Sequence, residues 1–274
     1  MKQLKLGEAL RNGQRVYGTV IVSPSPHWPA LVSTIGLDFV FIDTEHIPID
    51  RHELAWMCRS YGAMNLTPVV RIPSPDPYQA CMVLDGGACG VVAPYVETVE
   101  EVQALAGAVK LRPIKGKKLE QMIAGTSSPE PVLAKYLSER NADKALIVNI
   151  ESKPAMECLD DILKVPGLDA VLVGPHDLSC SLGIPEQYAN PMFVEAVDEI
   201  IRKAREHQVG AGIHLIFPET GLEQEIRWSQ AGANFILHSA DAIAFRDTLQ
   251  REVSRIKSAM GDGRPDAERG TINI

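Results

Sequence analysis

The sequence predicts an α/β fold, a (β/α)8 TIM barrel, because short buried strands alternate with helices along its length. Eight runs have the composition of strands: Val16–Val22, Asp38–Asp43, Pro68–Ile72, Gly90–Ala93, Ala145–Ile150, Ala170–Gly174, Gly210–Leu215 and Phe235–His238. Most gaps between them have helical periodicity, as in Arg51–Ser60, Pro77–Asp85, Val99–Val109, Ala155–Lys164, Pro191–His207 and Thr220–Gln230. Eight such units are typical of a closed parallel barrel.

Local signals mark where several elements begin and end. Rigid turn residues at 74–77 precede one helix, and Thr98 with Glu101 has the spacing of a helix N-cap and its acidic third position. Glycine-rich pieces at 85–90 and 210–212 do not form a nucleotide-binding loop. They are interpreted as stops before the next strand.

The chain length suits one barrel better than two small domains. It has 274 residues, of which 45% are hydrophobic. We expect a single domain over residues 1–260, with an excursion at about 110–144 and a loosely ordered tail at 261–274. The excursion is basic and then rich in Gly, Ser and Pro, which fits a lid, an interface loop or a solvated loop.

Composition excludes several classes of function. The formal net charge of -8 argues against nucleic-acid binding, and no apolar run reaches the ~18 residues of a membrane helix. We therefore expect a cytoplasmic protein that acts on a small molecule. The five scattered cysteines contain no Cys-x-x-Cys pair and are expected to be buried, reduced thiols.

Polar residues gather where the strands end, and in a parallel barrel these ends share one mouth. The candidates are Ser23, Asp43, Glu45, His46, Arg71, Glu97, Glu151, Asp177, His214, His238 and Ser239. Glu151 and Asp177 follow adjacent strands, and two carboxylates without cysteine suit Mg²⁺ or Mn²⁺. Helix capping is the alternative role for both acids.

The cation and the histidines admit more than one interpretation. Arg71 interrupts an apolar strand, so it needs an anion, which a substrate carboxylate or a structural Glu would supply. His46 ends a buried strand beside Asp43 and Glu45, either of which could orient it as a base. His214 and His238 have no ligand-like spacing and are interpreted as wall or core residues.

These residues resemble a known family, the HpcH/HpaI-type class II pyruvate aldolases related to 4-hydroxy-2-oxoheptanedioate aldolase and 2-dehydro-3-deoxyglucarate aldolase. The resemblance runs in order from about Gly18 to Arg246. Its motifs are Phe39-Val-Phe-Ile-Asp-Thr-Glu-His46, Pro68-Val-Val-Arg71, Leu84-Asp-Gly-Gly-Ala-Cys-Gly-Val-Val-Ala-Pro94, Ile150-Glu151 and Gly174-Pro-His-Asp-Leu-Ser179. It implies the phosphoenolpyruvate/pyruvate-binding type of barrel.

The resemblance also implies roles for single residues. Glu151 and Asp177 correspond to ligands of a divalent metal, Mg²⁺ or Mn²⁺, with Co²⁺ or Zn²⁺ as further candidates. Arg71 corresponds to the group that stabilises the pyruvate enolate, and His46 to the base, supported by Asp43. Substrate-binding positions are Arg71, Asn149, Gly174, Pro175, His176 and Asp177, where backbone amides near the last three hold the substrate carboxylate.

The activity implied is cleavage of a 4-hydroxy-2-oxo acid to pyruvate and an aldehyde by a metal-dependent lyase. Alternatives are a 2-oxo-acid decarboxylase or another lyase on this scaffold, a citrate lyase β-like enzyme acting on a coenzyme A ester, and a non-catalytic barrel. The family implies a homo-oligomer, hexamer or trimer, with Ala242–Met260 as an interface helix.

Two positions depart from the family pattern. Asn149 stands where family members commonly have Gln, and Asn is one methylene shorter. The family's Tyr-Pro-Pro-x-Gly-x-Arg loop is replaced by Leu111-Arg-Pro-Ile-Lys-Gly-Lys117, which is expected to line the aldehyde side of the site. The identity of the aldehyde therefore stays open.

Overall fold

The protein folds as a closed barrel of eight parallel strands in sequential order, which confirms the predicted fold class. A computed structural model describes residues 4–215 and 221–262. The strands are β1 Val16–Ile21, β2 Phe39–Asp43, β3 Thr67–Arg71, β4 Gly90–Ala93, β5 Ala145–Ile150, β6 Ala170–Val173, β7 Gly210–Leu215 and β8 Phe235–Ala240. All eight predicted strands are present, with ends shifted by at most two residues.

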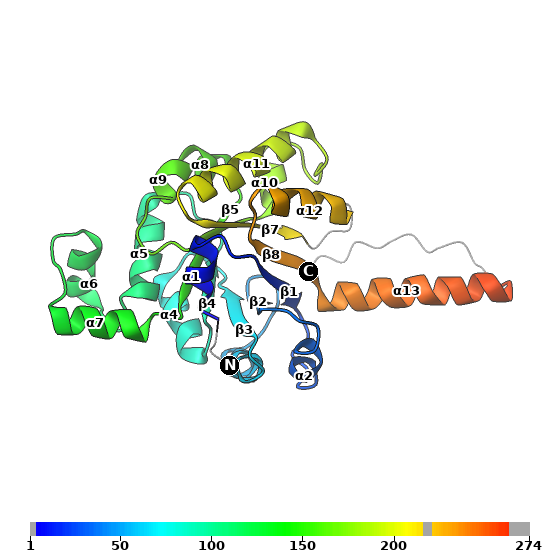
Figure 1. The fold of residues 1–274 in the computed structure, drawn as a ribbon, viewed down its shortest axis with the longest axis horizontal. Coiled ribbons are helices and arrows are strands. Elements are labelled where there is room, and N and C mark those ends of the chain that lie inside the picture. The colour runs from blue at the N-terminus through cyan, green and yellow to red at the C-terminus, as the bar shows by residue number, and fades with distance from the viewer. Residues whose placement is uncertain (1–3, 216–220, 263–274) are drawn as a thin grey trace.

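Helices surround the barrel (Figure 1). They are α1 Leu6–Arg11, α2 Trp28–Val32, α3 Arg51–Ala63, α4 Pro77–Gly86, α5 Val99–Lys110, α6 Gly116–Ile123, α7 Pro131–Arg140, α8 Lys153–Glu157, α9 Leu159–Ile162, α10 Pro175–Ser181, α11 Pro191–Glu206, α12 Gly221–Ala231 and α13 Asp241–Met260. Thr98 and Glu101 form the predicted cap of α5. The single helix predicted over 155–164 is instead two short helices, α8 and α9, that meet at Cys158.

Alternation along the strands divides the core into two parts. In β2, Phe39 and Phe41 belong to the cluster inside the barrel, whereas Val40 and Ile42 belong to the cluster between strands and helices. Both clusters are buried, so the strands read as continuous apolar runs. The polar exceptions lie near the carboxyl ends of the strands, and these define the site.

Helix α1 closes the opposite end of the barrel. Its apolar residues Leu6, Ala9 and Leu10 join the interior cluster. Asp169, just before β6, is fully buried there and pairs with Arg11 of α1 and with Lys110 Nζ at 2.5 Å. A buried carboxylate is costly unless it is paired, so these two cations stabilise the closed end.

The excursion after α5 contains two helices, α6 and α7, that stand apart from the barrel (Figure 1). The loop at 111–117 was expected to line the site, and this expectation is wrong for a single chain. Helix α5 runs from the mouth to the closed end, where Lys110 meets Asp169 and Arg112 Nη2 lies 2.6 Å from Asp85 Oδ1 at the end of α4. The loop therefore begins at the end of the barrel opposite the site.

Helix α13 extends away from the barrel (Figure 1). Ile243 in its first turn is buried, and the large apolar side chains further along are exposed: Phe245, Leu249, Val253, Ile256 and Met260. Beyond residue 262, the tail predicted at 261–274 lies outside the described residues. No helix in the described ranges is long and apolar enough to span a membrane.

The cysteines differ in part from the prediction. Cys58 and Cys89 are buried as expected, but Cys158 and Cys180 are exposed. Cys81 is half-buried, and no two of these five cysteines form a disulfide.

Candidate active site

Arg71 is held by two acids from the neighbouring strand end. The register of β2 and β3 sets Asp43 opposite Arg71, and Nε and Nη2 of Arg71 donate to Oδ1 and Oδ2 of Asp43 at 2.8 and 2.6 Å. Glu45 Oε2 lies 3.2 Å from Arg71 Nη1. The two hydrogen bonds to Asp43 are the paired geometry in which a buried guanidinium is best compensated. Structural acids thus partner Arg71, one of the two possibilities left open by the sequence.

The electrostatics of this pair keep both groups charged. Burial alone would raise the pKa of Asp43, but the hydrogen bonds and charge of Arg71 outweigh it, and the pKa is lowered. Burial alone would lower the pKa of Arg71. The hydrogen bonds and charge of Asp43, together with the charge of Glu45, outweigh burial, so the pKa of Arg71 is raised. The guanidinium is therefore a fixed positive charge at the base of the barrel mouth.

His46 lies beside Glu45 rather than Asp43. Its Nε2 is 3.7 Å from Glu45 Oε1, and its side chain is about half exposed. Asp43 is instead engaged by Arg71 and by the backbone amide of Glu45, at 3.0 Å. Among the described contacts, Glu45 is thus the acid that can orient His46. Asp43, which was expected to support His46, contacts Glu45 and Arg71 instead.

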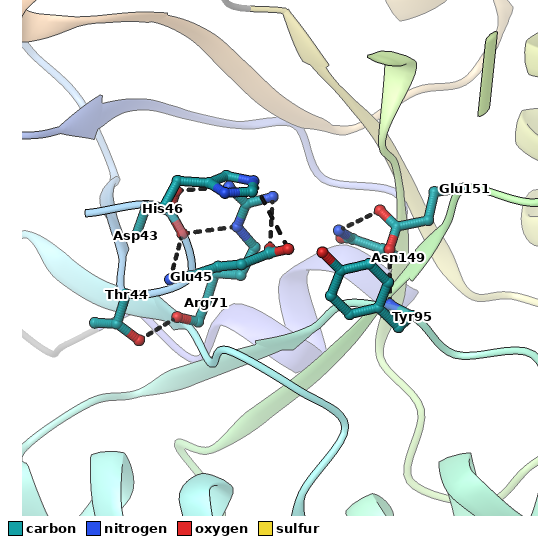
Figure 2. A network of polar contacts seen from close by, with 8 residues as sticks. All are labelled: Asp43, Thr44, Glu45, His46, Arg71, Tyr95, Asn149 and Glu151. Atoms are coloured by element: carbon teal, nitrogen blue, oxygen red, sulfur yellow. Dashed lines mark hydrogen bonds and ion pairs between the residues drawn. The ribbon is translucent and has the colours of Figure 1, made fainter. Parts of the chain in front are cut away.

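Glu151 faces the same mouth from the other side (Figure 2). It is 5% exposed, its Oε1 accepts a hydrogen bond from the Tyr95 amide at 2.6 Å, and its Oε2 accepts one from Asn149 Nδ2 at 2.9 Å. Burial, with a further contribution from nearby Asp177, raises the pKa of Glu151 to about 7. A cation bound between the carboxylates of Glu151 and Asp177 would stabilise the charged form of Glu151 and offset both its burial and its repulsion by Asp177.

The start of α10 completes this side of the site. Gly174 follows β6 and caps α10, and a Cβ added there would lie 2.4 Å from Glu151 Oε2, so a residue without a side chain is required. Pro175 is buried at the first position of α10, and His176 and Asp177 follow it on the exposed side. His176 Nδ1 is 3.8 Å from Glu186 Oε1. The backbone thus brings Asp177 close to Glu151.

The candidate metal donors on this side of the site are oxygen atoms. Besides the carboxylates of Glu151 and Asp177, Asn149 offers its Oδ1, a buried atom with no hydrogen-bond partner among the described residues. Oxygen donors suit Mg²⁺ or Mn²⁺, and a two-carboxylate set leaves positions for water and substrate. No cluster of three His, Cys, Asp or Glu residues occurs in the part of the chain that the structure describes.

Sequence reasoning missed Tyr95. This residue has a left-handed backbone, with φ of 57°, which aims its amide at Glu151. Its ring lies between the two halves of the site (Figure 2), and a hydrogen bond to Glu45, aided by burial, raises the pKa of its hydroxyl to about 12. Tyrosine is not a typical left-handed residue, so no pattern in the sequence pointed to this position.

The remaining strand-end candidates lie outside this group. The Ser23 amide donates to Asp241, Glu97 accepts from Ser152 Oγ at 2.6 Å, and His238 pairs with Glu225 of α12 at 2.7 Å on the outer wall. Ser239, with φ of 55°, lies within β8, where the pairing of this strand with β1 shifts register. His214 alone among them is buried beside the site, against the ring of Phe41.

Comparison with known proteins identifies the family of the chain. Residues 21–244 match the HpcH/HpaI aldolase/citrate lyase family. A 2-keto-3-deoxy-L-rhamnonate aldolase of Klebsiella pneumoniae is 30% identical over 249 residues, 91% of each chain. The enzyme of that name from Escherichia coli K12 is 29% identical over 251 residues, 92% of each chain. Both relatives are named aldolases, which are lyases, so the prediction that this protein is a lyase is confirmed.

Solved structures are similar across nearly the whole chain. An HpcH/HpaI aldolase from Desulfitobacterium hafniense has a TM-score of 0.78 and 27% identity, covering 92% of this chain and 96% of that one. The citrate synthase SbnG has a TM-score of 0.80 and 29% identity, covering 95% of this chain and 100% of that one. The chain therefore belongs to the HpcH/HpaI aldolase/citrate lyase family.

Proposed function

We propose that the protein is a divalent-metal-dependent aldolase that cleaves a 4-hydroxy-2-oxo acid into pyruvate, or a close analogue, and an aldehyde. One observation carries this proposal: the fixed cation of Arg71 and the buried carboxylate of Glu151 face the same barrel mouth. Such an arrangement suits a reaction in which negative charge develops on a small 2-oxo acid.

Glu151 and Asp177 would hold the metal ion, with Asn149 Oδ1 directed at a bound water or at the substrate. When bound, a divalent ion supplies Lewis-acid stabilisation of the developing enolate. Arg71 supports the same charge with its guanidinium, which Asp43 and Glu45 hold in one orientation. Because both acids are themselves buried or half-buried, the guanidinium cannot swing away without leaving them unpaired.

His46 would accept the proton of the substrate's C4 hydroxyl, directly or through water. Its exposed position beside Glu45 leaves room for the aldehyde half of the substrate. As the C3–C4 bond breaks, C4 becomes the aldehyde carbon and the electron pair passes to the enolate of the 2-oxo acid. A proton added at C3 then completes pyruvate.

A second candidate shares the first half of this chemistry. A decarboxylase or another carbon–carbon lyase could use the same enolate, and the structural likeness to a protein named citrate synthase SbnG supports a wider range of reactions on this scaffold. The coenzyme A ester alternative is less favoured, because the basic loop at 111–118 begins at the closed end of this chain's own barrel.

The proposal is tested by following the methyl protons of pyruvate in D₂O by NMR, with Mg²⁺ and then with a chelator. Metal-dependent exchange for deuterium is expected. Absence of exchange under both conditions would contradict enolate formation. Arg71→Lys, which keeps the charge but loses the paired hydrogen bonds, should slow exchange at least tenfold, whereas the exposed control Arg202→Lys should not.

We also propose that the chain forms a homo-oligomer, a trimer or a hexamer, in which a second copy covers α13. The exposed apolar residues of α13 recur at helical spacing on one face. A helix of this length with one buried side chain is poorly stabilised unless it packs on a partner. Light scattering should give more than one subunit. Phe245→Glu with Ile256→Glu should lower the mass, and Lys257→Glu on the same helix serves as control.

A further inference from the structure

A pocket lies outside the barrel, between helix α3 and the connection from β1 to α2. One wall is a strip along α3, formed by residues 52, 53, 56, 57, 60 and 61, and the other wall is formed by residues 23–26 with Pro29. The pocket has a volume of about 250 Å³ and contains none of the residues assigned above to the candidate active site. Pockets for drug-sized ligands begin at about 300 Å³, so this pocket suits a smaller molecule.

The wall from the β1–α2 connection is rigid. It includes Pro24, Pro26 and Pro29, and the ring of proline fixes its φ angle at about −65°. The connection is also tied to the start of α13, because the backbone amide of Ser23 donates to Asp241 Oδ2 at 3.0 Å. The pocket is therefore formed before any ligand binds, and little free energy is lost in shaping it around a ligand.

The wall from α3 carries polar groups that the chain itself leaves unpaired. The carboxylate of Glu53 has no hydrogen bond or ion pair within the described ranges, although its backbone amide donates to Asp50. Trp56, three residues further along the helix, is 62% exposed, and the ring of His52 lies 6.5 Å from its ring in an edge-on contact. An unpaired acid beside an exposed indole attracts an organic cation, both by charge and by cation–π interaction.

Tyr61 closes the inner side of the pocket. It is 1% exposed, and its hydroxyl is buried with no hydrogen-bond partner in the part of the chain that the structure describes. Burial and the nearby charge of Asp241 raise the pKa of Tyr61, so the hydroxyl stays protonated and can donate a hydrogen bond. Buried polar atoms are usually paired, and an acceptor oxygen of an occupant would pair with this group.

The charge of the lining disfavours anions. None of the described residues that line the pocket is Lys or Arg, and Glu53 contributes a negative charge. The charge of Asp241 also acts on Tyr61 from nearby. A carboxylate or phosphate ligand would therefore be repelled, which distinguishes this pocket from the Arg71 side of the barrel mouth.

The spacing of the two polar groups limits the length of the occupant. Glu53 and Tyr61 lie in the same helix, with their Cα atoms about 12 Å apart along its axis. The side chain of Tyr61 leans toward the helix N-terminus and shortens the distance between hydroxyl and carboxylate. An aromatic ring with a short aminoalkyl chain spans a distance of this order.

We propose that this pocket binds a small organic ammonium compound that has an apolar body and an acceptor oxygen at its far end. The ammonium group pairs with Glu53, the apolar body lies against Trp56 and Met57, and the oxygen accepts the hydrogen bond of Tyr61. The site is separate from the barrel mouth, so the proposal does not depend on the aldolase activity.

Calorimetric titration of the full-length protein with three phenols of similar shape tests the charge requirement. Tyramine has an ammonium group, 4-(2-hydroxyethyl)phenol has a hydroxyl group in its place, and 3-(4-hydroxyphenyl)propionate has a carboxylate. Tyramine should bind most tightly, the neutral phenol about threefold to tenfold more weakly, and the anion not measurably. Equal affinities for tyramine and the neutral phenol, or no binding of tyramine, overturn the proposal.

Matched variants test the individual contacts. Glu53→Gln should lower the affinity for tyramine and leave that for the neutral phenol unchanged, whereas Glu100→Gln, at an exposed acid of α5, should change neither. Tyr61→Phe removes only the hydroxyl. It should weaken tyramine binding about twofold to tenfold and spare 2-phenylethylamine, which lacks the phenol oxygen. An unchanged affinity for tyramine in Glu53→Gln, or equal losses for both amines in Tyr61→Phe, overturns the proposal.

A second copy of the chain is the competing occupant of this face. If a second copy covers the pocket, Trp56→Glu should lower the mass measured by light scattering, and the wild-type protein should bind no tyramine. That pair of results overturns the proposal. Tyramine binding by the wild-type protein, with an unchanged mass in Trp56→Glu, supports it.

Discussion

Tyr95 donates its backbone amide to Glu151 from a left-handed conformation, over a distance of 2.6 Å. The same residue directs its hydroxyl to Glu45 on the other side of the mouth (Figure 2). One residue therefore connects the carboxylate that would bind the metal with the acid that holds Arg71 and His46. Tyr95 therefore couples the position of Glu151 to the position of Glu45.

The first prediction concerns the Tyr95 hydroxyl. Tyr95→Phe should keep the fold and the amide bond to Glu151 while freeing Glu45, and pyruvate exchange should slow about threefold to tenfold, the range for one lost hydrogen bond. Because the pKa of Tyr95 is about 12, the wild-type rate should show no step from this group between pH 6 and 9. The exposed Tyr78→Phe is the matched control. Equal exchange rates for Tyr95→Phe and the wild type would show that the Tyr95 hydroxyl has no role in the exchange reaction.

The second prediction concerns stability and pH. The pKa of Asp43 is lower in the folded than in the unfolded protein, so its ion pair with Arg71 stabilises the fold fully above the unfolded pKa, about 3.9. This stabilisation is lost as the pH falls through the folded pKa. Asp43→Asn should therefore reduce the free energy of unfolding by about 3–5 kcal/mol at pH 7, and by less below about pH 4.

Urea unfolding at several pH values measures this difference. Asp161→Asn is the control, because Asp161 forms an exposed pair with Lys164 that should contribute about 0.5 kcal/mol or less. A difference for Asp43→Asn that stays constant down to pH 3 would contradict the assignment.

The third prediction separates the roles of His46 and Arg71. If His46 acts on the C4 hydroxyl, His46→Asn should slow aldol cleavage about 100-fold, in the usual range for a positioned base, and slow pyruvate exchange much less. His207→Asn, at the end of α11, should change neither rate. Steady-state cleavage assays and NMR exchange on one preparation measure both. Equal losses in the two assays would assign His46 to the enolate step instead.

The fourth prediction concerns the narrow contact at Gly174. Gly174→Ala would place a methyl group 2.4 Å from Glu151 Oε2 and must displace this carboxylate. Mg²⁺ affinity, measured by calorimetry, should fall at least tenfold even if the barrel remains folded. Gly62→Ala in α3 has free space around the added carbon and should bind Mg²⁺ as the wild type does. Retained affinity in Gly174→Ala would place the metal elsewhere.

The sequence was sufficient for the barrel because each strand is a continuous apolar run and a helix comes next in the order of described elements. It could not decide the partner of Arg71, because the pairing depends on the register between β2 and β3. Glu45 was undervalued for the same reason, since only the fold shows that it lies between Arg71 and His46.

Other misses have separate physical causes. The loop at 111–117 follows a helix, and segments that follow helices in such a barrel return to the end opposite the mouth, so its position was predictable from the order of elements. The role of Tyr95 could not be predicted from the sequence, because its left-handed backbone conformation depends on the surrounding contacts. His214 was interpreted as a wall residue, which its burial supports, but its unpaired nitrogen is visible only in three dimensions.

Helix α1 fills the closed end of the barrel with Leu6 and Leu10, so a substrate would enter and leave from the opposite end, the mouth. In the proposed reaction the aldehyde half lies on the side of exposed His46, and the 2-oxo acid lies deeper, between Glu151 and Arg71. Product release is then ordered: the aldehyde departs first, and the 2-oxo acid follows through the space that it vacates.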